Sequence, residues 1–99
     1  MCKYVSSLIL GYFDIEHMQL EENRLEAEEN AFKKRLGLKL KAHRDKAGLS
    51  QLKLALQSNI SRTQISRLEN GEISTSVVTF LRIAKALDLN QEEILDLLD

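Results

Sequence analysis

Four polar side chains are spaced so that one helix would carry them together on its outward face: Arg62, Thr63, Ser66 and Arg67. The same helix would bury Ile65 and Leu68, which lie three residues apart and so share the opposite face. An arginine can donate two parallel hydrogen bonds to the edge of guanine, and a threonine methyl can contact the methyl of thymine. Side chains of these types at this spacing are therefore suited to recognising base edges, with each good bidentate pair supplying about 1–3 kcal/mol of discrimination.

The surrounding residues, 48–71, have the sequence of two short helices joined by a sharp turn. Ser50 is a good N-cap for the first helix, and Asn59 tolerates the positive φ that such a turn needs. Ser61 caps the second helix, and Gln64 completes a Ser-x-x-Gln capping box. This order is the helix-turn-helix layout, whose second helix, here about residues 61–70, enters the major groove of DNA. The alternative is a helical hairpin that binds no nucleic acid.

The positive charge of the chain is concentrated around these two helices. The net charge of −1 divides into −5 over residues 1–32, +8 over residues 33–71 and −4 over residues 72–99. A basic region within a nearly neutral protein is the electrostatic pattern expected of a phosphate-binding surface. The alternative, a solvated basic helix over residues 33–46, explains less well why basic residues lie on both sides of the turn.

Length and composition favour one small all-α domain. The 99 residues include no proline and four glycines, and no apolar run reaches the roughly 20 residues needed to span a bilayer. Cys2 is the only cysteine, so an intrachain disulfide is excluded and a reducing, cytoplasmic location is expected. Cys2, His17 and His43 lack metal-ligand spacing, and the sequence has no phosphate-binding glycine loop or nucleophile elbow. We therefore expect no metal, no cofactor and no enzymatic activity.

Helical periodicity predicts the elements on either side of residues 48–71. The first helix of a domain over residues 33–99 should run over residues 32–47, after an extension over residues 1–32. Within the extension, residues 15–32 read as an acidic helix that either continues into the domain or forms a separate arm. Met18 is an alternative start of translation, which would make residues 1–17 an artefact.

Two more helices are predicted after the second helix of this layout. The first should begin after Ser76 and end at Leu87, and Asn90 and Glu93 should form a capping box for the second. The core face of the first is predicted from its helical spacing to consist of Val77, Phe80, Leu81, Ala84 and Leu87.

Residues 36–98 also resemble the lambda-repressor-like (Xre or Cro type) family of helix-turn-helix regulators. The resemblance is carried by Gly48-Leu49-Ser50-Gln51, by the run Ile65-Ser66-Arg67-Leu68-Glu69-Asn70-Gly71, and by Ile83-Ala84-Lys85-Ala86-Leu87. It implies an all-α, five-helix DNA-binding domain that acts as a dimer.

The resemblance further implies that Arg44 pairs with Glu69 in a structural salt bridge; Arg44 facing a phosphate is the competing interpretation. Gln51 would contact phosphate or brace the reading helix. Position indicates DNA-backbone or supporting contacts for five residues: Gln51, Gln64, Ser74, Thr75 and Ser76. The last helix has more apolar residues than one small face needs. They either cap the monomer core or form the dimer interface that the family suggests: Ile94, Leu95, Leu97 and Leu98.

Three leucines depart from the family pattern, because Leu38, Leu52 and Leu56 occupy positions that are commonly polar. Three exposed leucines would form an adhesive patch, so we expect another segment to cover them. The apolar and acidic residues 1–35 are the candidate, with a dimer arm, a partner-docking site and an acidic mask of the DNA face as alternative roles.

Two functions from different classes fit the sequence. The first is a sequence-specific transcriptional regulator, a dimeric repressor that binds a palindromic operator in double-stranded DNA. The second is the antitoxin of a toxin–antitoxin pair, which would autoregulate its operon and hold a partner protein through residues 1–35. A neighbouring toxin gene would favour the second, and neighbouring phage or restriction genes would favour the first.

Overall fold

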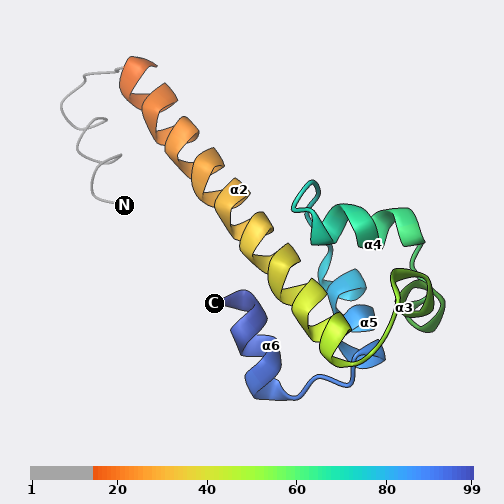
Figure 1. The fold of residues 1–99 in the computed structure, drawn as a ribbon. Coiled ribbons are helices and arrows are strands. Elements are labelled where there is room, and N and C mark those ends of the chain that lie inside the picture. Colours follow the sequence, from red (N-terminus) through yellow and green to blue (C-terminus); the bar gives the residue numbers. More distant parts are fainter. Residues whose placement is uncertain (1–14) are drawn as a thin grey trace.

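The computed structural model describes residues 15–99, with side chains from Leu20 onward, and this part of the chain consists of helices and connecting turns (Figure 1). Predictions made for residues 1–14 lie outside the described residues. The all-α class and the five-helix architecture are confirmed. The helices are α2 (Ile15–Lys46), α3 (Gln51–Ser58), α4 (Arg62–Glu69), α5 (Val77–Ala86) and α6 (Gln91–Leu98).

Helix α2 is twice as long as the helix predicted over residues 32–47. Its 32 residues extend about 48 Å at 1.5 Å per residue. The acidic segment 15–32 therefore continues into the domain, and the alternative of a separate arm is wrong for these residues. The first half of α2 projects away from the body formed by the other helices (Figure 1). Helix α2 passes from residue 32 to residue 33 without a break. A functional boundary between residues 1–32 and 33–99 therefore stays a prediction.

Short-range hydrogen bonds fix the ends of the four short helices. The side chains of Ser50, Ser61, Ser76 and Asn90 each accept a bond from the backbone N–H three residues on. Asn90 and Glu93 form the complete predicted capping box. For Ser61, the structure has the bond from the Gln64 N–H to its hydroxyl, which is one half of the predicted box. Local capping chemistry thus sets where each helix begins.

Positive backbone φ angles mark the turns between helices. Asn59, in the turn between α3 and α4, has φ 56°, as predicted for a sharp turn built without glycine. Gly48 and Gly71 both have φ 72° and end α2 and α4 with paired i→i−5 and i→i−3 backbone bonds, the Schellman arrangement. Asp88 has φ 53° and ends α5 with the equivalent pair of backbone bonds. This role was not predicted from the sequence.

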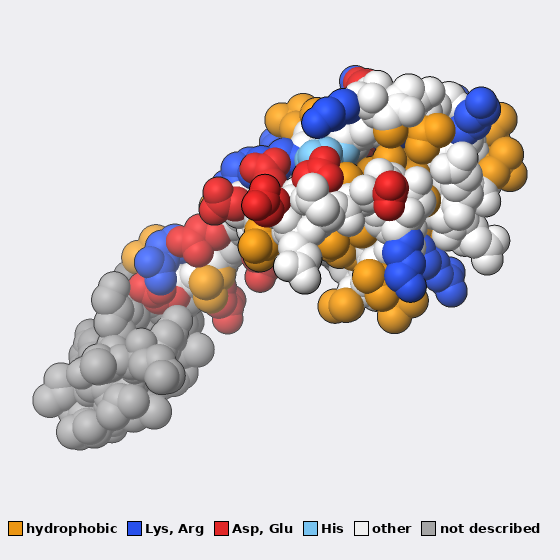
Figure 2. Space-filling model, turned by 90° about the horizontal axis from the view of Figure 1, so that it is seen from below, with side chains coloured by type: hydrophobic (Ala, Val, Ile, Leu, Met, Phe, Trp, Pro, Cys, Tyr) orange, Lys and Arg blue, Asp and Glu red, His pale blue; other side chains and the backbone are white. Residues whose placement is uncertain are grey.

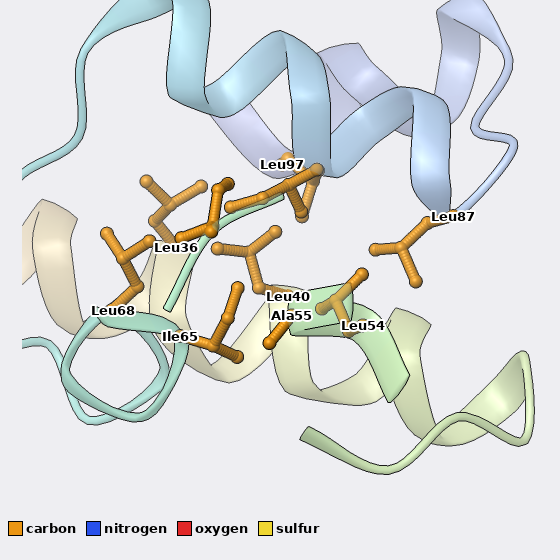
Figure 3. Close-up of a cluster of buried hydrophobic side chains, with 10 residues drawn as sticks. Leu36, Leu40, Leu54, Ala55, Ile65, Leu68, Leu87 and Leu97 are labelled. Carbon is orange, nitrogen blue, oxygen red and sulfur yellow. The ribbon is translucent and has the colours of Figure 1, made fainter. Parts of the chain in front are cut away.

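The core lies where α2, α3, α4, α5 and α6 meet (Figure 3). Two predictions for α5 are wrong: Val77 is 83% exposed and Leu81 is exposed as well. The face of α5 that packs inward differs from the predicted face. It contains Ile83, which is 1% exposed, together with Ala84 and Leu87. The buried apolar residues of the cluster are Leu36, Leu40, Leu54, Ala55, Ile60, Ile65, Leu68, Ile83, Leu87 and Leu97.

The leucines predicted to need a cover are exposed in the described part of the chain. Leu38, Leu52 and Leu56 all face outward, and Leu56 is 74% exposed. Helix α2 cannot supply the predicted cover, because its first half continues straight away from the body (Figure 1). Over residues 15–99, no helix is long and apolar enough to cross a membrane.

Candidate nucleic-acid interface

Helix α4 presents the four predicted base-contact residues on one face. Ile65 and Leu68 are buried beneath α4, which turns the other side of the helix outward. The outward side forms an open, shallow hollow of about 370 Å³. Its lining consists of Arg62, Thr63, Ser66 and Arg67 from α4, together with Gln51, Asn70 and Glu72. The spacing argument thus places the four side chains in one cavity, and their contact with bases stays a prediction.

The end of α4 rests directly on the backbone of α2. A Cβ atom added at Gly37 would lie 2.5 Å from the carbonyl oxygen of Glu69 and 2.9 Å from its carbonyl carbon. Both are backbone atoms, so they cannot swing away as a flexible side chain could. Gly37 is therefore the position that lets α4 approach α2 this closely, a role that was not predicted from the sequence. A glycine within a strong helical pattern is the signal that could have indicated it.

A buried ion pair joins the same two helices. Arg44 Nε donates to Glu69 Oε2 at 2.6 Å, and Arg44 Nη2 donates to Glu69 Oε1 at 3.0 Å. The two residues are 8% and 6% exposed. Arg44 Nη1 also donates to the backbone oxygen of Leu49 at 2.8 Å, which ties the pair to the turn before α3. The guanidinium points inward, so the competing interpretation of Arg44 as a phosphate contact is wrong.

The carboxylate of Glu69 stabilises the positive charge of Arg44. The hydrogen bonds that Arg44 donates to Glu69, and then the negative charges of Glu69 and Asp45, raise the pKa of Arg44 above its already high ordinary value, against the opposing effect of burial. Arg44 therefore carries its charge throughout the neutral range. A bidentate arginine–carboxylate pair of this kind fixes orientation as well as supplying energy.

Gln51 connects this buried pair to the outward hollow. Its Nε2 donates to Glu69 Oε1 at 3.0 Å, while the residue also lines the hollow beside α4. This contact makes Gln51 a brace of α4 in the structure. The amide nitrogen carries a second N–H that this bond does not use, and a phosphate oxygen accepts only from a donor, so a phosphate contact for Gln51 stays a prediction.

The other predicted backbone contacts lie around α4 and before α5. Gln64 is half-buried on α4. The Ser76 hydroxyl accepts from the Thr79 N–H at 3.1 Å and donates to the Thr79 hydroxyl at 3.0 Å, so it is engaged as the cap of α5. Thr75 donates to the backbone oxygen of Ser76. Ser74 lines a different hollow, on the α2 side, and none of these four residues lines the hollow beside α4.

One of the predicted dimer contacts needs correction. Leu97 is 1% exposed and belongs to the core cluster of its own chain, so its side chain is unavailable to a partner. Helical spacing alone did not reveal which of the four apolar residues of α6 faces α2. Leu95 and Leu98 are exposed and Ile94 is half-buried, which leaves these three as candidates.

Two polar residues of the hollow were not predicted from the sequence, Asn70 and Glu72. They follow α4 directly, and the bond from the Glu72 N–H to the Arg67 oxygen at 2.9 Å turns the chain back beside the helix. Within the part of the chain that the structure describes, no cluster of three His, Cys, Asp or Glu side chains could hold a metal ion. The site is thus a polar, arginine-bearing surface on a rigidly held helix.

Comparison with known proteins identifies the family. A family model described as helix-turn-helix matches residues 40–94, more than half of the chain. The chain belongs to the helix-turn-helix family. Within this family the chain is of the lambda-repressor-like type, as the sequence indicated. Proteins of this family and fold are DNA-binding transcriptional regulators.

A solved helix-turn-helix structure supports the same assignment. The restriction-modification controller protein C.AhdI from Aeromonas hydrophila is 34% identical, with a TM-score of 0.62, over 65% of this chain and 97% of that chain. The similarity therefore spans nearly all of that protein and about two thirds of this one. A search of curated protein sequences finds no match.

Proposed function

We propose that this helix-turn-helix protein is a sequence-specific repressor that binds a palindromic operator in double-stranded DNA as a dimer. The observation that carries the proposal is the hollow on α4, which brings Arg62, Thr63, Ser66 and Arg67 together on one outward face. Helix α4 would enter the major groove, where the residues at its beginning contact base edges. Such a regulator works on DNA in the cytoplasm and needs neither a cofactor nor catalysis.

The hydrogen-bond network beneath α4 supports this role. Base recognition requires side chains held in a fixed position by rigid supporting contacts. Arg44, Glu69 and Gln51 provide such contacts at the end of α4, and Gly37 allows the close approach to α2. Ser74, Thr75, Ser76 and Gln64 remain proposed backbone contacts, which would position the protein without reading sequence.

The proposed dimer follows from exposed apolar residues in the last helix. Leu95 and Leu98 on α6 are exposed, and Ile94 is half-buried beside them. Two copies related by a two-fold axis would place their α4 helices in successive major grooves, with half-sites about 34 Å apart. The likeness to a protein described as a restriction-modification controller supports a regulator of this kind.

Selection from a random DNA pool with the full-length protein tests the proposal. The expected result is enrichment of a palindromic site whose half-sites lie about one helical turn, roughly 10 base pairs, apart. Enrichment of a single half-site would retain reading by α4 but reject the dimer. Absence of enrichment would reject sequence-specific binding.

Arg67→Ala should relax the base preference at one position of each half-site and leave the other positions unchanged. The physical reason is the loss of a guanidinium that can bond two acceptors of one guanine. Selected pools from the parent and the variant give the measurement, and Arg24→Ala is a matched control. Arg24 is an exposed arginine on the projecting half of α2, bonded to Glu21 at 2.6 Å. An unchanged preference in Arg67→Ala would remove this residue from the reading face.

The antitoxin function remains a second candidate because of the projecting half of α2. Leu20 and Leu25 are exposed there, on a stretch of helix that extends beyond the domain body (Figure 1). A partner protein bound along residues 1–35 would bury this surface. Co-purification of the untagged product of an adjacent gene with this chain would support the second candidate, and an isolated gene would favour the first.

A further inference from the structure

A groove lined by apolar and acidic side chains lies where the projecting half of α2 meets the domain body. The groove has a volume of about 390 Å³, and Ser74 and Lys33 complete its wall. Its other four residues are spaced i, i+3, i+4 and i+7, so they occupy one face of the helix. This acidic groove is formed by Leu25, Glu28, Glu29 and Phe32.

Helix α5 carries an exposed face of matching spacing and opposite charge. Val78 and Leu81 are large exposed apolar residues, and Arg82 and Lys85 are exposed beside them. These four residues also follow i, i+3, i+4 and i+7, and we call them the basic ridge. Both sets span about 10 Å along their helices, because seven residues rise about 1.5 Å each. The groove thus holds an apolar pair and an acidic pair, and the ridge holds an apolar pair and a basic pair. The acidic pair lies between the apolar residues of the groove, whereas the basic pair follows the apolar residues of the ridge.

The groove and the ridge are unpaired within one chain. Among residues 20–99, neither the two glutamates of the groove nor the two cations of the ridge form a salt bridge. Figure 2 shows acidic side chains gathered along the arm between the residues drawn in grey and the domain body. Negative charge at this place repels DNA, so the arm is unsuited to contact the operator.

We propose that the acidic groove of one copy receives the basic ridge of a second copy. The inference rests on the proposed dimer and places its interface on α2 and α5 instead of on the apolar residues of α6. A two-fold interface requires that each chain carry both complementary surfaces, so that each contact occurs twice. This chain meets the requirement, since α2 carries the groove and α5 carries the ridge. The arm would then be a dimerisation element added to the helix-turn-helix domain.

Charge reversal with mixing tests the contact. One variant carries Glu28→Lys and Glu29→Lys, and the other carries Arg82→Glu and Lys85→Glu, all at exposed positions. Each variant alone opposes like charges at both contacts and should raise the dimer dissociation constant at least about tenfold. The equimolar mixture restores opposite charges at both contacts and should form a mixed dimer. Sedimentation equilibrium and native mass spectrometry at low ionic strength measure the two states.

A matched control on the same arm separates local contact from overall charge. Glu22→Lys with Glu26→Lys makes the same change in net charge, but neither residue lines the groove, so this variant should dimerise like the parent. Circular dichroism of all variants verifies that each remains helical.

Two outcomes would overturn the inference. If the charge-reversed variants dimerise as tightly as the parent, or their mixture yields no mixed dimer, the interface lies elsewhere, for example at Leu95 and Leu98. In that case a palindromic site selected by the parent would still uphold the proposed function. A parent that is monomeric yet enriches a half-site would reject the groove contact and the dimer together, while reading by α4 would stand.

Discussion

Glu69→Ala is expected to lower the free energy of unfolding by about 3–5 kcal/mol, because it leaves the buried guanidinium of Arg44 without its partner. In a domain of this size, such a loss corresponds to a fall in melting temperature of more than about 10 °C. Chemical denaturation of the parent and the variant measures the difference. The same change should weaken DNA binding, since Glu69 also holds Gln51 beside the α4 hollow.

Two further variants keep this prediction testable if Glu69→Ala does not fold. Arg44→Met combined with Glu69→Leu replaces the whole pair by apolar side chains and should be more stable than Glu69→Ala alone. Glu21→Ala breaks the exposed pair with Arg24, also 2.6 Å long, and should cost less than about 1 kcal/mol. If Glu69→Ala cost no more than Glu21→Ala, the buried pair would not stabilise the position of α4.

Gly37→Ala should destabilise the protein by about 1–3 kcal/mol, although alanine is the better helix former. In an unhindered helix, replacing glycine by alanine stabilises by about 1 kcal/mol. Here the added Cβ would meet backbone atoms of Leu68 and Glu69 at the end of α4 and force the two helices apart. Thermal unfolding gives the sign of the change, and binding to the selected operator reports the displacement of α4.

The control for this prediction is the opposite substitution on the solvent side of the same helix. Ala42 is exposed on α2, so Ala42→Gly should cost only the usual helix-propensity difference of about 1 kcal/mol. A Gly37→Ala protein that is more stable than the parent would show that α2 and α4 can separate without cost, contrary to the packing described above.

Features that depend on neighbouring residues were predictable from the sequence. The caps Ser50, Ser61, Ser76 and Asn90 were identified correctly because side-chain-to-backbone bonds form within three residues. The turn at Asn59 was identified for the same reason, since its positive φ is a property of that residue type. These local signals, in the right order, were sufficient to predict the helix-turn-helix layout.

Features that depend on the packing between helices were predicted less well. Helical spacing in α5 placed Val77 and Leu81 in the core, but spacing cannot determine which edge of an apolar stripe faces inward, and Ile83 occupies that place. Leu97 was assigned to a dimer interface for the same reason. The role of Gly37 depends on the backbone of residues 68–69, which lies some thirty residues away in the sequence.

The candidate site was predictable in its position and incomplete in its members. Arg62, Thr63, Ser66 and Arg67 were grouped correctly, because a helix with Ile65 and Leu68 buried must present them outward. Asn70 and Glu72 were missed, since the turn after α4 brings them back toward the helix. The full length of α2 was left open, since residues 15–32 were expected either to continue into the domain or to form a separate arm, and the helix continues.

The central claim is that the outward face of α4 reads DNA sequence, and the specificity ratio of Arg62→Ala combined with Arg67→Ala tests it most directly. Affinities for the selected operator and for a scrambled duplex are measured for the parent and the double variant at one salt concentration. We expect the ratio to fall by about tenfold or more per arginine, with a much smaller change in binding to the scrambled duplex. A double variant that retains the parent's ratio would contradict the assignment of α4 as the reading helix.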